Sequence, residues 1–214
     1  MGTRHLICVV VNDEIKLAQY GQWDGYPEGQ GVKVLEFVRW LKEPGALSKA
    51  VEVFSSLEVA SPEDVIQSWI ACGADEQRIR SDGMVSFEIG QVHKTKFPEY
   101  SRDTGANVLP MIMDRAAEGR PVKIQSVDPS FAADSLFCEW AYVVDLTNKR
   151  LEVFKGFQKA PHNKGRFAAL PLDTNRDGTP SGYWPVAEVC RFEFDDLPAN
   201  GTFVAVLQPP EEAE

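Results

Sequence analysis

The segment from Gln22 to Gly31 holds the residues best suited to chemistry in this chain. Its sequence, QWDGYPEGQG, combines two aromatic side chains, two carboxylates and three glycines, and it follows directly after a predicted strand. Aromatic rings offer area for stacking and carboxylates offer charge, and binding sites often lie on such loops. We therefore predict that a ligand is bound by Gln22, Trp23, Asp24, Tyr26 and Glu28. The alternative is a folded turn whose two aromatic rings cover the edge of the core.

Glu139 is a second candidate, because it lies in a stretch, Leu136 to Leu146, that reads as a strand apolar on both faces. A carboxylate in such a strand has either a cationic partner or a raised pKa. Arg4, on the first predicted strand, and Arg102 are the possible partners. We therefore add Arg4 and Glu139 to the predicted binding residues. A purely structural ion pair, or a Glu139 that faces water at a strand edge, is the alternative.

A third candidate is the run DTNRDG at residues 173–178, which matches the first half of a calcium-binding loop. In such a loop oxygen ligands at the first, third and fifth positions converge, and glycine at the sixth makes the turn. Trp184 stands at the twelfth position, where the loop needs a bidentate glutamate. The sequence therefore supports only a weak metal site, formed by Asp173, Asn175 and Asp177, and it favours a turn rich in Asp and Asn.

Other familiar site patterns are missing from the sequence. His5, His93 and His162 have no metal-ligand spacing, and the chain contains no glycine-rich phosphate loop and no G-x-S-x-G nucleophile turn. The four cysteines lie far apart without a CxxC pair, so we expect free thiols that pack in the interior of a protein from a reducing compartment. We therefore expect no cofactor.

Charge and hydropathy limit the partners. The 214 residues include 22 Lys and Arg against 32 Asp and Glu, which gives a net charge of −10. Nucleic-acid recognition needs a basic patch, so this balance argues against it. No apolar run reaches the ~18 residues of a membrane span, and the N-terminus lacks a secretory pattern. We expect a cytoplasmic protein that binds a small molecule or another protein, and neither nucleic acid nor a membrane.

The elements that must position these residues follow from hydrophobic periodicity. Helices are expected at 34–41, 47–54, 62–72 and 108–117. Strands are expected at 4–11, 14–21, 84–89, 121–127, 136–146, 150–157, 184–194 and 202–207. Strands at both ends with helices between them predict an α+β fold, with mainly antiparallel sheet covered by helices. We expect one domain over residues 1–207 and a flexible acidic tail over 208–214.

This arrangement also looks like the sandwich of N-terminal-nucleophile hydrolases. In that class the first residue of the mature chain attacks an amide, and its own amine acts as the base. Gly2 has no nucleophile, so this alternative function requires processing that exposes Thr3. The Gly2–Thr3 junction resembles the processing site of threonine-type members.

Five blocks of the sequence are distinctive: MGTR at 1–4, AQYGQWDGYPEGQG at 18–31, SRDTG at 101–105, LFCEWAY at 136–142 and DDLP at 195–198. These blocks resemble a family of uncharacterised bacterial, phage and fungal proteins, and they extend over most of the chain. The resemblance implies a phage-related setting. The family has no established activity, so the resemblance implies no catalytic residues.

Overall fold

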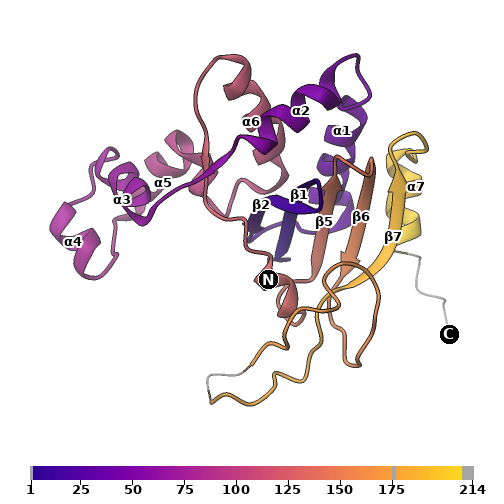
Figure 1. The fold of residues 1–214 in the computed structure, drawn as a ribbon. Helices are drawn as coiled ribbons and strands as arrows, with labels where there is room; N and C mark the ends of the chain where they lie inside the picture. Colours follow the sequence, from indigo (N-terminus) through magenta and orange to yellow (C-terminus); the bar gives the residue numbers. More distant parts are fainter. Residues whose placement is uncertain (1, 175–176, 209–214) are drawn as a thin grey trace.

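A mixed five-stranded sheet forms the centre of the computed structural model, which describes residues 2–174 and 177–208 (Figure 1). In spatial order the strands are β2 (Glu14–Gly21), β1 (His5–Val11), β5 (Trp140–Asp145), β6 (Arg150–Lys155) and β7 (Ala187–Glu193). β1 and β5 run parallel, whereas the other three neighbouring pairs are antiparallel. With its helices, this sheet confirms the predicted α+β fold and its mainly antiparallel pairing.

The α-helices of the described residues are α1 (Val32–Trp40), α2 (Ala46–Ser55), α3 (Pro62–Ile70), α4 (Glu76–Ser81), α5 (Phe87–Lys96), α6 (Val108–Ala117) and α7 (Asn200–Leu207). Shorter elements are the parallel pair β3 (Glu58–Val59) and β4 (Lys123–Ile124), and the helical turns η1 (Pro27–Gly31), η2 (Pro98–Tyr100), η3 (Gly105–Asn107) and η4 (Ser130–Ala133). The helices expected around 34–41, 47–54, 62–72 and 108–117 are therefore confirmed.

Two hairpins, each made of two strands expected from the sequence, organise the sheet. β1 and β2 are joined by Asn12 and Asp13, whose φ angles of 53° and 63° lie in the left-handed region. Two-residue hairpin turns require this conformation, and Asn and Asp tolerate it better than most residues. β5 and β6 are joined by residues 146–149. The local sequence was sufficient to place both hairpins.

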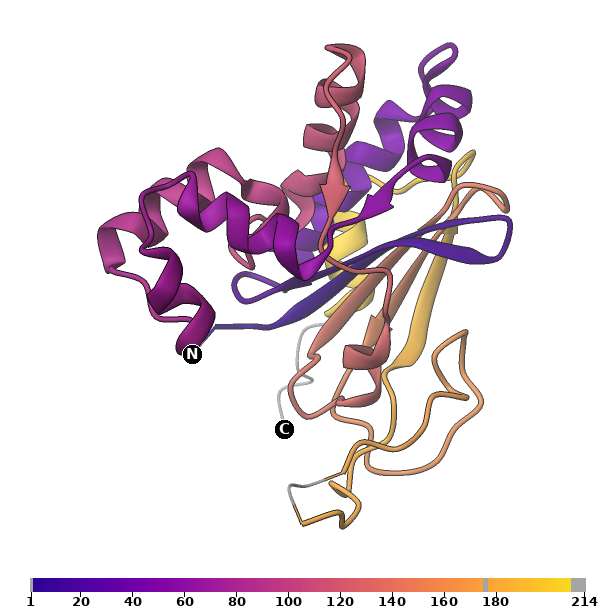
Figure 2. The same cartoon turned by 60° about the vertical axis from the view of Figure 1, so that its left-hand side comes forward.

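The two faces of the sheet are covered differently. Helices α1, α2, α6 and α7 pack on one face, where they enclose the larger apolar cluster (Figure 2). The opposite face is covered by η4 and by parts of the connection between β6 and β7, including Phe167 and Val186. β1 is buried along its whole length, as its unbroken apolar run predicts. Cys8 and Cys138 pack in the second cluster as predicted, and Cys72 and Cys190 are half-buried free thiols.

The resemblance to a hydrolase sandwich extends only to the mixture of helices and strands. The described residues form one large sheet and the two-stranded β3–β4 sheet. One face of the large sheet meets helices and the other meets loops, and no second large sheet is stacked on it in this part of the chain.

Helices α3, α4 and α5 form an arm, residues 62–96, that extends from the rest of the molecule (Figure 1). No described residue of the arm belongs to either apolar cluster. The arm is attached through the β3–β4 pair and through an ion pair of 2.7 Å between Asp64 Oδ1 and Lys123 Nζ. Ser61 and Asp64 form a reciprocal capping box at the start of α3, which confirms the predicted helix start.

Two predicted strands are wrong, and a third is shorter than expected. Residues 84–89 lead into α5, because Ser86 caps a helix by accepting a hydrogen bond from Ile89 N at 3.3 Å. Residues 202–207 belong to α7, whose Phe203 and Leu207 are buried at helical spacing despite the β-branched residues around them. The strand expected at 121–127 shrinks to the two residues of β4.

Candidate functional site

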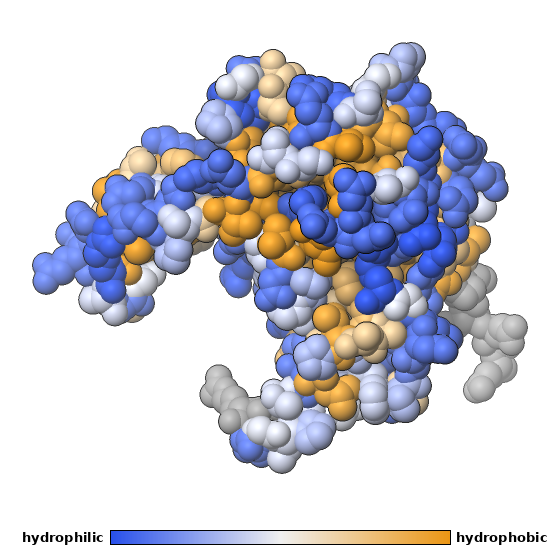
Figure 3. Space-filling model, viewed as in Figure 1, coloured by the Kyte–Doolittle hydropathy of each residue, from blue (hydrophilic) through white to orange (hydrophobic). Residues whose placement is uncertain are grey.

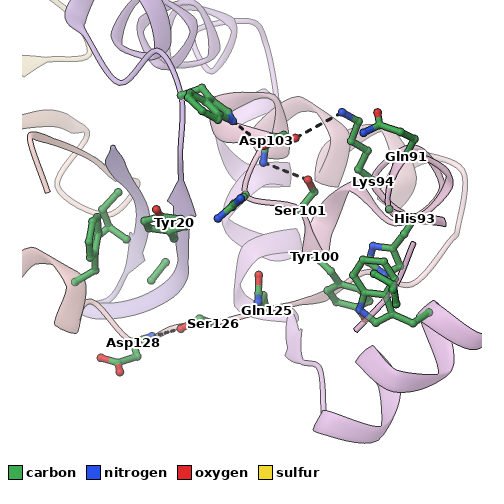
Figure 4. A pocket seen from close by; sticks show the side chains of 18 of the residues that line it. Tyr20, Gln91, His93, Lys94, Tyr100, Ser101, Asp103, Gln125, Ser126 and Asp128 are labelled. Atoms are coloured by element: carbon green, nitrogen blue, oxygen red, sulfur yellow. Dashed lines mark hydrogen bonds and ion pairs between the residues drawn. The ribbon is translucent and has the colours of Figure 1, made fainter. Parts of the chain in front are cut away.

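A cleft of about 880 Å³ lies between the arm and the outer edge of β2 (Figure 4). Its lining includes aromatic side chains from segments far apart in the sequence: Tyr20, Trp23, Trp69, Phe87, Tyr100 and Phe131. On the face seen in Figure 3, apolar side chains gather where the arm meets the rest of the molecule. This cleft is larger than three other concavities of the described residues, which makes it the best candidate for a site.

The outer edge of β2 supplies one wall of the cleft. Its backbone groups are not bare, because Gln22 N donates to Arg102 O at 3.0 Å and Ala18 N donates to Ser126 O at 2.8 Å. The Gln19 side chain also donates to Ser101 O at 3.1 Å. These hydrogen bonds cover a sheet edge that would otherwise be open to pairing. They also fix the turn at 101–103 against the sheet.

Asp103 lies in the turn at 101–103 and connects this turn to the segment after β2 and to α5. Its Oδ1 accepts a hydrogen bond of 3.0 Å from the indole Nε1 of Trp23, which belongs to the segment after β2. Its Oδ2 lies 3.6 Å from Nζ of Lys94 on α5. Figure 4 shows Asp103 joined to Lys94 by a dashed line, so this carboxylate links the body to the arm.

The arm presents a stack of rings to the cleft. The imidazole of His93 lies parallel to the indole of Trp69, with centroids 3.5 Å apart. The side chains of Tyr100 and Phe97 continue this stack. Burial lowers the pKa of His93 and so favours its neutral form, although Glu99 opposes this shift.

Ser68 and His93 resemble a nucleophile and its base, since Ser68 Oγ lies 2.7 Å from His93 Nε2. Ser68 Oγ also lies 2.6 Å from the carbonyl oxygen of Val65, which can only accept. A hydroxyl has one proton, so both interactions are satisfied when Ser68 donates to Val65 and accepts from His93. In this arrangement His93 cannot take the serine proton, and the pair serves to hold α3 against α5.

The predicted binding segment reaches the cleft through Trp23, whose side chain is 48% exposed. Asp24, Tyr26 and Glu28 are exposed but do not line the cleft. The side chain of Gln22 accepts a hydrogen bond from Tyr20. Trp23 and Tyr26 are 48% and 40% exposed, so neither ring is enclosed in the core.

Hydrogen bonds with the rest of the molecule hold the backbone of residues 22–31 in place. The hydroxyl of Tyr142 donates to Gly25 O at 2.9 Å, and the buried side chain of Gln30 accepts from Ala106 N at 2.8 Å. Residues Pro27–Gly31 form a π-helical turn that continues into α1. The segment is therefore a rigid support that presents Trp23 at its edge.

Arg4 and Glu139 lie side by side just before β1 and β5 but do not form the expected ion pair. Glu139 N donates to Arg4 O at 3.2 Å, whereas the Arg4 guanidinium lies 4.5 Å from the centre of the Phe137 ring. Glu139 is half-buried and makes no ion pair with any described basic side chain, Arg102 included. Neither residue lines the cleft. Their role in binding stays a prediction.

Thr3 is buried beneath the start of the 22–31 segment and is 2% exposed. Its carbonyl accepts from Gly25 N at 3.0 Å, and its hydroxyl has no hydrogen-bond partner among the described residues. The ring of His5 is packed closely between Gly21 and Gly25. In the intact chain, Thr3 is therefore closed off from a substrate.

The candidate calcium loop falls partly outside the described residues, because Asn175 is not among them. Asp177 Oδ1 accepts hydrogen bonds from the backbone and hydroxyl of Thr179, at 3.0 and 2.7 Å. This is the Asp-based turn that the sequence favours. Within residues 2–174 and 177–208, no group of three or more His, Cys, Asp or Glu side chains could hold a metal ion.

Sequence reasoning missed most of the cleft, including Tyr20, Trp69, Phe87, Lys94 and Tyr100. Trp69 reads as the apolar side of a helix, and Phe87 falls in a segment mistaken for a strand. The available signal was the SRDTG block, which contains Arg102 and Asp103.

Among the described residues, no helix has the length and apolar character needed to cross a membrane. No protein-family model, no curated protein and no solved structure matches the chain.

Proposed function

We propose that this protein binds a small molecule in the cleft between the arm and the β2 edge, with Trp23 as the main contact. The observation that carries the proposal is the convergence of six aromatic side chains from separate segments on one concave surface. The volume of about 880 Å³ falls within the range of small-molecule sites.

The exposure of these rings supports binding. Trp23 is 48% exposed and Phe87 is 75% exposed. Burial of such a side chain contributes about 1.5–3 kcal/mol, so a ligand that covers either ring gains a substantial free energy. A planar apolar group would gain most, because aromatic pairs add a preferred stacking geometry.

Binding is favoured over catalysis because no described group in the cleft is arranged as an activated nucleophile. The Ser68 hydroxyl is engaged by Val65, and burial keeps His93 neutral and stacked. The cleft therefore offers recognition chemistry: stacking area, amides and charged side chains.

A ligand screen by thermal shift tests the proposal. Fragments that raise the Tm of the unaltered protein are measured again with Trp23→Ala and Phe87→Ala, which we expect to lose most of the shift. Trp40→Ala is the matched control, because Trp40 is 40% exposed but lies on α1 outside the cleft. If Trp23→Ala and Trp40→Ala respond alike to every fragment, the cleft is not the binding site.

Amide hydrolysis with Thr3 as the nucleophile is the second candidate. The observation in its favour is that the Thr3 hydroxyl and both nitrogens of nearby His5 lack hydrogen-bond partners in the described, unprocessed chain. The intact mass of protein purified from its natural host separates the two functions. A chain that starts at Thr3 supports the hydrolase, and a chain that retains Gly2 excludes it.

A further inference from the structure

Some of the charged side chains that line the cleft have hydrogen-bond or ionic partners among the described residues, and one does not. Asp103 interacts with Trp23 and Lys94, and both oxygens of Asp128 accept from Ser130 of its own turn, at 2.9 Å each. Arg102 also lines the cleft and is exposed, but its side chain has no hydrogen bond or ion pair with any described residue. The guanidinium is therefore a cation in the cleft without a carboxylate partner.

The position of Arg102 is set by the sheet. Its carbonyl accepts from Gln22 N at 3.0 Å, and the preceding carbonyl, that of Ser101, accepts from the Gln19 side chain at 3.1 Å. The hydroxyl of Ser101 also accepts from Asp103 N, which closes the turn. A guanidinium on such an anchored turn is better placed for recognition than one on a free loop, because less backbone order has to be gained on binding.

Lys94 can supply a second positive charge from the opposite wall. Its Nζ lies 3.6 Å from Asp103, beyond a good hydrogen bond, and the two side chains are 40% and 39% exposed. Ion pairs of this exposed kind contribute little stability. The exposed ammonium of Lys94 is therefore open to a second anion in the cleft as well as to Asp103.

Neutral polar side chains also line the cleft. Figure 4 shows Gln91 beside Lys94 on the arm and Gln125 on the side near Ser126. Neither side-chain amide has a hydrogen-bond partner among the described residues, so both can donate to or accept from a ligand. The rings of Trp23 and Tyr20 line the same cleft as Arg102.

We propose that the ligand of this cleft is a small anion attached to a planar ring, with its carboxylate or phosphate on Arg102 and Lys94 and its ring against Trp23. This inference rests on the proposed function and names the ligand class for the same site. A guanidinium matches the paired oxygens of a carboxylate or a phosphate, and hydrogen bonds between charged groups are the strong ones.

Isothermal titration calorimetry with two matched pairs of probes tests the inference. Indole-3-acetate is compared with indole-3-acetamide, and adenosine 5′-monophosphate with adenosine, so each pair differs mainly in the anionic group. We expect at least one anion to bind about tenfold or more tightly than its neutral counterpart. The pair that shows the difference identifies the carboxylate or the phosphate as the preferred group.

Variants of single arginines assign this difference to the cleft. Arg102→Gln should remove most of the difference in affinity between the anion and the neutral probe, because only Lys94 remains, and it should leave the neutral probe unaffected. Arg78→Gln is the matched control, because Arg78 is also an exposed arginine but lies on α4, outside the cleft, and should leave both affinities unchanged. Circular dichroism and Tm confirm that both variants are folded.

The anion inference is overturned if the anion and its neutral counterpart bind with equal affinity, or if Arg102→Gln weakens the binding of both probes equally. The proposed function stands in either case if binding of the probes still depends on Trp23. Absence of binding by all four probes at millimolar concentration also overturns the anion inference. The proposed function then depends on the thermal-shift screen with uncharged fragments, so the two failures are distinguishable.

Discussion

His5 is fully buried beside the start of the Gln22–Gly31 segment, and neither ring nitrogen has a hydrogen-bond partner among the described residues. Burial lowers the pKa of His5 from 6.5 to about 4, with a smaller contribution from Lys33, while the Thr3 backbone opposes the shift. The imidazole is therefore neutral in the folded state at neutral pH, and burial disfavours its charged form.

This burial predicts a loss of stability in acid. Between pH 6.5 and pH 4 the unfolded chain binds a proton at this histidine and the folded chain does not. The free energy of unfolding must therefore fall as the pH falls through this window, by up to about 3 kcal/mol from this group. Urea unfolding from pH 7 to pH 4 measures the fall.

The variant His5→Leu separates this histidine from the acidic residues that titrate in the same window. Between pH 7 and pH 4, the free energy of unfolding of His5→Leu should fall by about 3 kcal/mol less than that of the unaltered protein, whatever the stability of the variant at pH 7. Parallel stability curves for His5→Leu and the unaltered protein would show that His5 is not the source.

We expect the three helices of the arm to have the lowest local stability in the fold. Its helices contribute no residue to the two apolar clusters, and Ser68, His93 and Ala74 are its only buried side chains within the described residues. Helices with little buried apolar surface open more easily than core strands. Amide hydrogen exchange should therefore be much faster in α3, α4 and α5 than in β1 and β5.

A variant of the capping box at the start of α3 provides a control for the hydrogen-exchange prediction. Ser61→Ala removes one capping hydrogen bond and costs about 1 kcal/mol, so it should speed exchange at the start of α3 and leave α6 unchanged. If the arm exchanges as slowly as β1, it is part of the cooperative core and the cleft is rigid.

The same elements show which signals in the sequence were sufficient. α3 was predictable because Ser61, Pro62 and Asp64 mark a helix start whatever the surroundings. α7 was not, because its Val and Phe residues favour a strand locally, and burial of Phe203 against Phe192 selects the helix. Predictions failed where long-range packing outweighs local preference.

At the scale of the whole molecule, the cleft could not be predicted because its walls are far apart in the sequence. Trp23 was identified from local composition, but its partner Asp103 and the facing Lys94 are brought to it only by the arm and by the turn on β2. The pairing of β1 with β5 was equally hidden, and it places Arg4 beside Glu139 without an ion pair. Sequence patterns predict elements, and the contacts between distant elements make the site.

A buried charge cluster joins the long connection between β6 and β7 to the sheet. Arg166 donates to Glu152 at 2.6 Å and to Asp145 at 2.7 Å, and both carboxylates are almost fully buried. Burial alone would raise the pKa of Asp145, but hydrogen bonds from Asn148 and Arg166 outweigh it and hold the pKa below its usual value. Arg150 is the other cation of this cluster.

Arg166→Ala should therefore destabilise the whole molecule, because it leaves two buried carboxylates with Arg150 as their remaining ionic partner among the described residues. We expect a loss of about 3 kcal/mol in urea unfolding at pH 7. The loss should shrink as the pH is lowered through the range where Asp145 gains a proton, because the neutral acid needs no cation. Arg191→Ala, which breaks the more exposed pair with Glu188, should cost at most about 1 kcal/mol. Equal effects of the two variants would mean that the cluster does not hold the connection to the sheet.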